Sequence, residues 1–332
     1  MPGDPYPTAR AAIVQASPVY LNRDASVEKA IGLIGEAAAG GAQIVAFGET
    51  WLPGYPVWFD NGPNAALWGE QTTKELHAEL VQNSVVVPSP ATEALARAAR
   101  ENSVYLAMGV HERIDTQNRG TLYNTILYFD PSGSLAGLHR KLVPTYQERM
   151  VLGQGDGSTL TVIDTPHGRL GGLVCWEHAM PLARQALHQK GEQIHVAVWP
   201  AVWDMHQVMS RHYAFEGRTF VLSAASVVRV TDMPEHLPGL QGLTVADGEY
   251  LIEGGSAIIG PDGSYLAGPV YKEETILYAD LDMRKIAEEL TTLDVVGHYN
   301  RPDVFQLTVN EQPLQGIGQP TAHSIDGASE LY

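Results

Sequence analysis

Cysteine is nearly absent from this sequence, because Cys175 is the only one among 332 residues. A lone cysteine cannot form an intramolecular disulfide, and it excludes CxxC motifs and metal sites built from several thiolates. Such sparing use of cysteine is typical of proteins in a reducing compartment.

Long apolar runs are also missing. No stretch approaches the roughly 18 residues that a membrane-spanning helix needs. Residues 1–7 (MPGDPYP) offer neither the basic nor the apolar region of a signal peptide. We therefore expect a cytoplasmic protein without a membrane partner.

Basic residues are scarce, with 21 Lys and Arg against 38 Asp and Glu and a formal net charge of −17. A chain this acidic repels nucleic acid and anionic membrane surfaces. We expect no nucleic-acid partner, whereas small neutral substrates remain compatible with this charge.

The usual phosphate and metal motifs are absent as well. There is no GxxxxGK[ST] sequence, and residues 153–158 (GQGDGS) lack the third glycine of a dinucleotide-binding GxGxxG. The 12 histidines show no spacing typical of metal ligands. We expect no metal site.

Helices and strands are predicted to alternate at first and to pair in hairpins later, without a composition break that would divide the body. This order indicates one α/β domain with mixed sheets. A helix at 25–39 follows Asp24, a possible N-cap residue, and residues 53–70 are expected to form an ordered functional loop. Residues 231–250 are expected to be a long loop, and 311–332 a flexible tail. Strands are expected at 10–16, 43–48, 103–111, 121–129, 134–139, 159–165, 169–174, 194–199, 219–225, 255–260, 264–270 and 275–281, and further helices near 72–82, 91–101, 179–190, 205–217 and 282–290.

A short internal similarity links two parts of this order. Residues 41–44 (GAQI) and 191–194 (GEQI) both follow a predicted helix and open an apolar strand. The similarity suggests two related halves, although four residues do not establish a duplication.

Cys175 ends a predicted strand shortly before a predicted helix. A turn of this kind exposes a side chain and aims backbone N–H groups at it, which predicts a lowered thiol pKa and donors for a developing anion. The alternative is a buried structural cysteine, which position alone leaves equally open.

Two other strand ends carry charged side chains, Glu49 and Lys141. Either one alone could be a solvated surface charge. With Cys175 they form a candidate catalytic triad at three strand ends. His178 lies near the cysteine in sequence, and we interpret it as a packing neighbour rather than as the catalytic base.

Three blocks then resemble the nitrilase superfamily: 47–56 (FGETWLPGYP), 139–145 (HRKLVPT) and 174–178 (VCWEH). They follow the family's order of glutamate, lysine and cysteine, and 174–178 resembles its nitrile-cleaving branch. Residues 297–304 (GHYNRPDV) resemble a block near the end of the family's catalytic region, so that the resemblance covers about residues 8–305. Residues 306–332 would be a C-terminal tail, flexible or used in oligomer contacts.

The resemblance implies a four-layer α-β-β-α sandwich, a homo-oligomer (a dimer or a larger spiral assembly) and hydrolysis of a small-molecule nitrile without any cofactor. In that chemistry Glu49 is the general base, Lys141 stabilises the anion and Cys175 is the nucleophile. Glu148 resembles the family's second glutamate and would orient Lys141 or the water; a salt bridge with Arg149 or another basic residue is the alternative.

Five aromatic residues are candidates for substrate binding, although packing in the core or an interface would explain each equally well. An aromatic pocket would favour aryl or arylaliphatic nitriles. Leu152 stands where many relatives carry an aromatic residue, a departure that bears on pocket shape. The five candidates are Tyr55, Trp58, Trp176, Trp199 and Trp203.

Other activities remain open at this point. An amidase, a carbamoylase or a cyanide-hydrolysing enzyme of the same superfamily would use the same triad. A catalytically inactive scaffold with this fold is a further alternative, and the intact Glu49, Lys141 and Cys175 argue against it.

Overall fold

The computed structural model describes residues 5–62, 64–65, 67–114, 120–243, 245 and 248–313. Within these residues the strands form two mixed sheets of seven strands each. The first sheet has the order β14–β1–β2–β4–β5–β6, with β3 paired to β4. Its strands are β1 (Thr8–Gln15), β2 (Ile44–Phe47), β3 (Val85–Val86), β4 (Tyr105–Arg113), β5 (Leu122–Phe129), β6 (Leu135–Arg140) and β14 (Thr275–Asp282).

The second sheet has the order β11–β12–β10–β9–β8–β7, with β13 paired to β12. Its strands are β7 (Val162–Thr165), β8 (Gly168–Val174), β9 (Ile194–Val198), β10 (Phe220–Ala224), β11 (Val227–Arg229), β12 (Tyr250–Ile259) and β13 (Tyr265–Tyr271).

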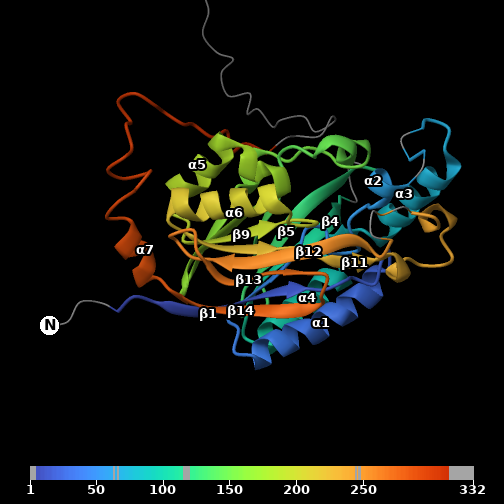
Figure 1. Ribbon diagram of the computed structural model, residues 1–332, viewed down its shortest axis with the longest axis horizontal. Helices are drawn as coiled ribbons and strands as arrows, with labels where there is room; N and C mark the ends of the chain where they lie inside the picture. Colours follow the sequence, from blue (N-terminus) through green and yellow to red (C-terminus); the bar gives the residue numbers. More distant parts are fainter. Residues whose placement is uncertain are drawn as a thin grey trace, which may run out of the picture.

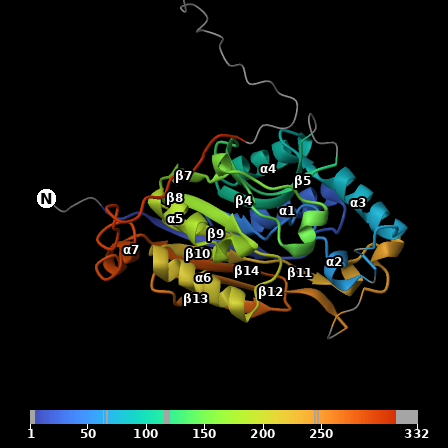
Figure 2. The same ribbon diagram turned by 90° about the horizontal axis from the view of Figure 1, so that it is seen from above.

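Helices cover the outer face of each sheet, which makes four layers (Figure 1). The first sheet is covered by α1 (Arg23–Ala39) and α4 (Pro90–Glu101), and the second by α5 (Pro181–Gln189) and α6 (Asp204–Gly217). Figure 2 shows α2 (Trp58–Asn61) and α3 (Gln71–Asn83) at the end of the sandwich opposite α7 (Arg284–Glu289). The predicted single-domain α-β-β-α sandwich is confirmed.

Strand β1 illustrates why the sandwich has two separate cores around its first sheet. Successive side chains of a strand point to opposite faces. Ala11 and Ile13 lie in the cluster between the two sheets, whereas Ala12 and Val14 lie in the cluster under α1 and α4. Both faces are buried, so the strand is apolar throughout rather than alternating.

The start of α1 differs from the prediction. The N-cap is Asn22, whose side chain accepts a hydrogen bond from the backbone N–H of Ala25, and Asp24 lies in the first turn. Both residue types are good caps. Asn22 is preferred because its backbone is extended whereas that of Asp24 is already helical.

Strand β12 begins at Tyr250 rather than at the predicted residue 255. Gly254 and Gly255 have φ angles of +85° and +97°, and the register with β13 shifts at this point. Two glycines are typical of a loop, but here they form an irregularity inside one long strand.

The predicted similarity between residues 41–44 and 191–194 has a structural counterpart. The side chain of Gln43 accepts a hydrogen bond from the backbone N–H of Arg10, and that of Gln193 accepts one from the backbone N–H of Arg169, each at 3.1 Å. Each glutamine precedes a strand that pairs in parallel with the strand carrying its arginine. The two halves therefore use one device to set the register of β2 and β9.

The described part of the predicted loop 231–250 packs against the body. It contains short 3₁₀ turns, and its apolar side chains share a cluster with α2 and α3. The predicted tail is described only as far as residue 313. Leu307 and Val309 pack against the core between the sheets, and Lys190 forms a salt bridge with Glu311.

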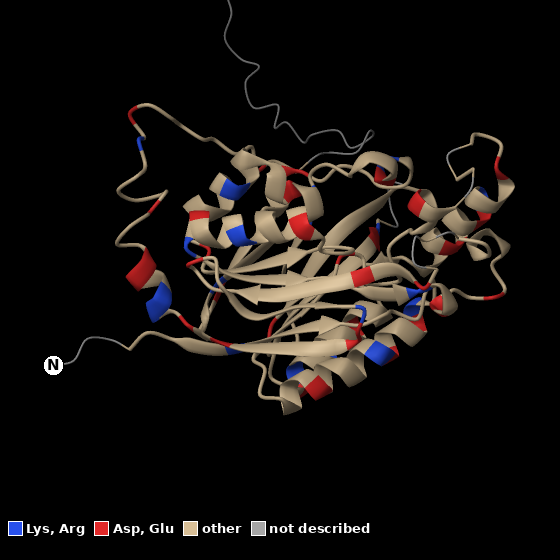
Figure 3. Cartoon of the chain, in the orientation of Figure 1, with Lys and Arg blue, Asp and Glu red and all other residues tan. Residues whose placement is uncertain are grey.

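Charged residues lie mostly on the outer helices and at strand ends, and the central strands carry few of them (Figure 3). Charged side chains buried between the sheets are therefore exceptions that need partners. Among the described helices, none combines the length and the apolar character needed to cross a bilayer.

Candidate active site

Cys175 lies where β8 ends and a short 3₁₀ turn (Cys175–Ala179) begins. Its φ angle is +52°, in the left-handed region that residues other than glycine rarely adopt. The side chain is buried within the core cluster between the sheets. A strained backbone at a strand-to-helix turn is typical of functional sites.

The thiol pKa is opposite to the predicted one. Burial and the nearby Glu49 carboxylate raise the pKa of Cys175 well above its ordinary value. Lys141 and the backbone N–H of Trp176 act in the other direction but do not prevail. The prediction of a lowered pKa was wrong because it considered the turn without its burial. The resting thiol is neutral and needs a base before it can attack.

Glu49 and Lys141 come from different strands of the first sheet and meet between the sheets. The Lys141 ammonium is 3.0 Å from Glu49 Oε1, and both side chains are fully buried. The residue before Glu49 is Gly48, and a Cβ atom at Gly48 would lie only 3.0 Å from the backbone of Ala225. The chain therefore passes close to the second sheet at this point.

Glu148 completes this ion cluster, with its Oε2 only 2.7 Å from the Lys141 ammonium. The same oxygen accepts a hydrogen bond from the backbone N–H of Thr145, and Oε1 accepts one from the Tyr55 hydroxyl. Arg149 instead donates to a backbone carbonyl. The structure therefore pairs Glu148 with Lys141 and leaves the alternative salt bridge with Arg149 unformed.

The cluster holds one cation between two carboxyl groups, and this balance sets the pKa values. Burial raises the pKa of Glu49 to about 7. Repulsion by Glu148 adds to this rise, whereas attraction by Lys141 opposes it. Burial alone would lower the pKa of Lys141, but Glu49, Cys175 and Glu148 raise it above its ordinary value. Lys141 stays charged, whereas Glu49 changes protonation state near neutral pH.

Asn124, on β5, was not singled out from the sequence. Its side-chain amide donates to Glu49 Oε1 at 2.6 Å, and its backbone oxygen accepts from the N–H of Lys141. The detectable signal was a buried amide in an otherwise apolar strand. Glu49 Oε2 has no partner among the described residues, so it remains free to accept a proton.

Glu177 was quoted as part of a motif but not given a role. Its Oε2 accepts from the backbone N–H of Val174 and lies 2.8 Å from His139, and its Oε1 accepts from the N–H of Leu142. Burial alone would raise the pKa of Glu177, but His139 and the two N–H groups hold it below its ordinary value. This carboxylate joins the strand ends that precede Cys175 and Lys141.

His178 contacts the backbone rather than the sulfur of the candidate nucleophile. Its Nδ1 is 2.7 Å from the carbonyl oxygen of Cys175, and its ring stacks on Trp199 with centroids 4.7 Å apart. This position agrees with its interpretation as a packing neighbour.

Two of the five predicted aromatic residues lie on the side of the first sheet. Tyr55 reaches the ion cluster through Glu148. Trp58 is buried in the cluster formed with α3 and the loop 231–250, where it packs against Phe59. Leu152 belongs to the same cluster and donates its backbone N–H to the carbonyl oxygen of Glu148.

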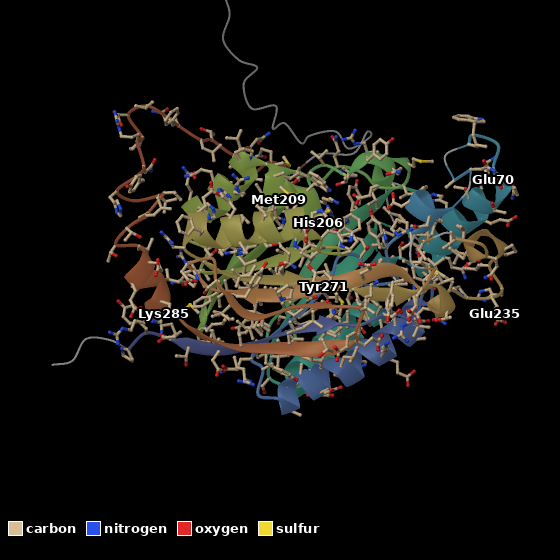
Figure 4. All side chains as sticks on the ribbon, viewed as in Figure 1. Glu70, His206, Met209, Glu235, Tyr271 and Lys285 are labelled. Atoms are coloured by element: carbon tan, nitrogen blue, oxygen red, sulfur yellow. The ribbon has the colours of Figure 1, made fainter. Side chains whose placement is uncertain are left out.

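The other three aromatic residues gather around His206 on α6, which is labelled in Figure 4. Ring centroids of Trp199, Trp203 and Trp176 lie 4.8, 5.3 and 5.8 Å from that of His206. Trp199 is fully buried, and its carbonyl oxygen accepts the backbone N–H of Glu49. Trp176 and Trp203 are 50% and 60% exposed, so they are the two of the three that solvent molecules reach.

Acidic and histidine side chains are abundant near this site, but they do not form a metal centre. Across the described part of the chain, no group of three or more His, Cys, Asp or Glu residues is placed to hold a metal ion. Lys141 pairs with both carboxyl groups of the cluster, and Asn124 donates to Glu49 Oε1, which leaves Glu49 Oε2 as the one oxygen of the two groups without a partner among the described residues.

Comparison with known proteins identifies the family of the chain. The sequence profile of the carbon–nitrogen hydrolase family matches residues 10–288. The chain is 44% identical over 311 residues to an aliphatic nitrilase of Sinorhizobium fredii, covering 93% of this chain and 97% of that protein. It is 43% identical over 320 residues to Nitrilase 3 of Arabidopsis thaliana, with coverage of 95% and 90%. A bifunctional nitrilase/nitrile hydratase of Nicotiana tabacum is 41% identical, with coverage of 94% and 88%.

Solved structures share the fold at much lower sequence identity. The Caenorhabditis elegans NitFhit protein superposes with a TM-score of 0.68 at 16% identity, covering 92% of this chain and 68% of that one. An amidase from Nesterenkonia gives a TM-score of 0.60 at 19% identity, with coverage of 84% and 92%. The resemblance to the nitrilase superfamily is confirmed, and the chain belongs to the carbon–nitrogen hydrolase family.

Proposed function

We propose that this protein hydrolyses organic nitriles to carboxylic acids and ammonia without a cofactor. The observation that supports it most is the buried cluster in which Lys141 bridges Glu49 and Glu148 beside the single cysteine. A neutral buried thiol, a carboxylate with a free oxygen and a fixed cation are the three parts that covalent attack on a nitrile needs. The similarity to proteins named as nitrilases supports the choice of substrate class.

In the first step Glu49 Oε2 takes the thiol proton while the sulfur of Cys175 bonds to the nitrile carbon. One bond of the C≡N group breaks, and the proton passes from Glu49 to the nitrogen, which gives a thioimidate. Negative charge develops on that nitrogen in the transition state. The Lys141 ammonium and the backbone N–H of Trp176 stabilise it.

Water completes the reaction in two further steps. Glu49 takes a proton from a water molecule that adds to the thioimidate carbon, and the nitrogen receives that proton. The hydroxyl proton of the tetrahedral intermediate passes to the nitrogen as the C–N bond breaks, so that ammonia leaves and a thioester remains. A second water, again deprotonated by Glu49, attacks the thioester, and the departing sulfur regains its proton.

Glu148 acts through Lys141 rather than on the substrate. Its contacts with Tyr55 and the backbone of Thr145 fix the carboxylate, and the carboxylate fixes the ammonium. Lys141 thereby meets the developing charge without the reorganisation that a mobile side chain would require.

The exposed rings of Trp176 and Trp203 are proposed to contact the organic group of the nitrile, because Trp176 adjoins the nucleophile and His206 links the two rings. Flat apolar surfaces of this kind favour aryl or arylaliphatic groups. Trp58 and Trp199 are fully buried and would act by shaping the pocket wall.

A panel of aliphatic, aryl and arylaceto nitriles with their matching amides, assayed for ammonia, tests the proposal. We expect ammonia from at least one nitrile class, with turnover abolished in Cys175→Ala, Glu49→Gln and Lys141→Ala while circular dichroism remains unchanged. Full activity of Cys175→Ala would refute the mechanism. Turnover of amides or of cyanide alone would replace the nitrile by one of those substrates.

A second outcome of the same chemistry is amide release. If the C–S bond of the tetrahedral intermediate breaks before the C–N bond, the product is an amide and the enzyme is free again. The similarity to a bifunctional nitrilase/nitrile hydratase favours testing for it. Chromatography of the products against an authentic amide standard measures the ratio.

A further inference from the structure

A second group of buried polar side chains, separate from the Glu49 cluster, extends away from Cys175. His178 Nδ1 lies 2.7 Å from the Cys175 carbonyl oxygen, and His178 Nε2 lies 2.8 Å from His195 Nε2. His195 Nδ1 lies 2.9 Å from Glu192 Oε1, and the Tyr213 hydroxyl donates to Glu192 Oε2 at 2.6 Å. All five residues are buried. The mechanism above uses only the first of them.

The positions of the protons follow from the Cys175 carbonyl oxygen, which ends this series of hydrogen bonds. The Cys175 carbonyl can only accept, so His178 Nδ1 carries a proton and donates it. In a neutral ring His178 Nε2 then accepts, and His195 Nε2 must donate. The remaining nitrogen of a neutral His195 is an acceptor, so Glu192 must donate as a protonated carboxylic acid.

The surroundings of Glu192 favour this neutral arrangement over an ion pair with His195. Burial raises the pKa of Glu192 to about 8 and lowers that of His195 well below its ordinary value. Tyr213 from α6 donates to the carboxyl group. His188 from α5 and His139 from β6 act on Glu192 and His195, and Glu192 in turn acts on Tyr128 from β5. Glu177 acts on His195 and His178, and Arg184 from α5 and Glu216 from α6 act on Tyr213.

We propose that Glu192 is a positioning residue that, as a neutral acid, holds the nucleophile turn through His195 and His178. The hydrogen bond to the Cys175 carbonyl fixes the left-handed backbone that aims the sulfur and the Trp176 N–H at the substrate. This inference rests on the proposed function only in taking Cys175 as the nucleophile.

Loss of the Glu192 proton reverses the hydrogen bonds from Glu192 to His195 and from His195 to His178, whereas Tyr213 still donates to Glu192. A carboxylate accepts from His195 Nδ1, which leaves His195 Nε2 as an acceptor. His178 must then carry its proton on Nε2, and its Nδ1 lone pair faces the lone pairs of the Cys175 carbonyl. The contact that supports the turn becomes repulsive. Glu192 lines a cavity of about 320 Å³ together with His188 and Arg218, although its own side chain is fully buried.

Glu192→Gln separates the two protonation states. A glutamine amide donates to His195 Nδ1, its oxygen accepts from Tyr213, and it cannot ionise. His178→Phe keeps a ring on Trp199 but removes the donor to Cys175. Leu95→Ala, on α4 of the opposite helix layer, controls for lost stability.

The assay is the rate of iodoacetamide alkylation of the full-length protein, followed by intact mass at about pH 6.5 and about pH 9.5, on either side of the Glu192 pKa. Cys175 is the only thiol in the chain, so the alkylation that Cys175→Ala lacks has one origin. Hydrolysis of a nitrile is measured in parallel.

We expect Glu192→Gln to match the wild-type rate within about two-fold at the lower pH and to exceed it about five-fold at the higher pH. His178→Phe should be about ten-fold slower than wild type at the lower pH, and Leu95→Ala should be unchanged. The inference would be overturned if the ratio of the alkylation rates of Glu192→Gln and wild type did not change with pH, or if Glu192→Gln were alkylated as slowly as His178→Phe. Absence of nitrile turnover with the expected alkylation pattern would refute the proposed function alone.

Discussion

Replacing Glu177 by glutamine tests whether one buried carboxylate holds the two sides of the site together. The carboxylate accepts three hydrogen bonds, from the N–H groups of Val174 and Leu142 and from His139. Burial alone would lower the pKa of His139, but Glu177 raises it. The carbonyl oxygen of Thr159, 2.9 Å from His139 Nδ1, and the carboxylate at Nε2 both accept, so both ring nitrogens donate and the pair is ionic. A carboxamide has one acceptor oxygen, so its NH₂ group must face at least one of these donors.

The expected cost follows from what is left unpaired. A buried N–H without an acceptor costs about 1–3 kcal/mol, and breaking a buried ion pair costs about 3–5 kcal/mol. The two contributions share the same donors and do not add. We therefore expect Glu177→Gln to lower the free energy of unfolding by about 3–5 kcal/mol. Turnover should also fall about 100-fold, because the ends of β8 and β6 are no longer fixed to each other.

Urea denaturation followed by circular dichroism gives the stability, and ammonia release gives the turnover. Glu288→Gln is the matched control, since this exposed carboxylate only pairs with Arg284 and Lys285 on α7. It should leave the urea midpoint and the rate unchanged. A loss of less than about 1 kcal/mol in Glu177→Gln, with normal turnover, would refute the reasoning.

Three further outcomes are expected. The activity of the wild type should rise with pH through about 7, where Glu49 becomes ionised. Asn124→Ala should move this rise to higher pH, because it removes a hydrogen-bond donor that lowers the pKa of Glu49. A pH profile in which the rise does not move would contradict this assignment. Tyr55→Phe removes a donor to Glu148, and a drop of about ten-fold in kcat at unchanged melting temperature is the expected result of steady-state and thermal measurements. Leu95→Ala leaves a cavity at a fully buried position under the first sheet, so urea titration should show a loss of about 2–5 kcal/mol in the free energy of unfolding while kcat stays normal. A large loss of kcat would speak against separate roles of the core and the site.

Much of the site could be predicted because its charged residues stand at strand ends. Apolar runs place the strands, and a charged residue directly after a buried run is pulled toward the sheet edge. Glu49 and Cys175 were found in this way without knowledge of their contacts. The same reasoning singled out Trp199, which occupies after β9 the position that Glu49 occupies after β2, five residues beyond the opening isoleucine.

The missed features depend on contacts between residues far apart in the chain. Asn124 is 75 residues from Glu49, and no local pattern predicts their hydrogen bond. The thiol pKa of Cys175 was predicted wrongly for the same reason, because burial by the opposite sheet outweighs the local turn. The cap of α1 shows a milder form of the problem, since Asn22 and Asp24 are both suitable residue types and backbone geometry decides between them.

We expect the geometry of the candidate active site to depend on polar contacts between the sheets more than on the apolar core around them. Apolar packing is not directional, and a core can relax around a small loss of volume. The backbone hydrogen bond from Glu49 to Trp199 and the Glu177 carboxylate both cross from one sheet to the other, and each fixes an atom of the proposed machinery to within hydrogen-bond tolerance. Variants of these contacts should therefore lose turnover and stability together, whereas core variants such as Leu95→Ala should lose stability alone. If core and inter-sheet variants of equal stability showed equal turnover, the sandwich as a whole would position the catalytic groups, and the individual polar contacts would have no special role.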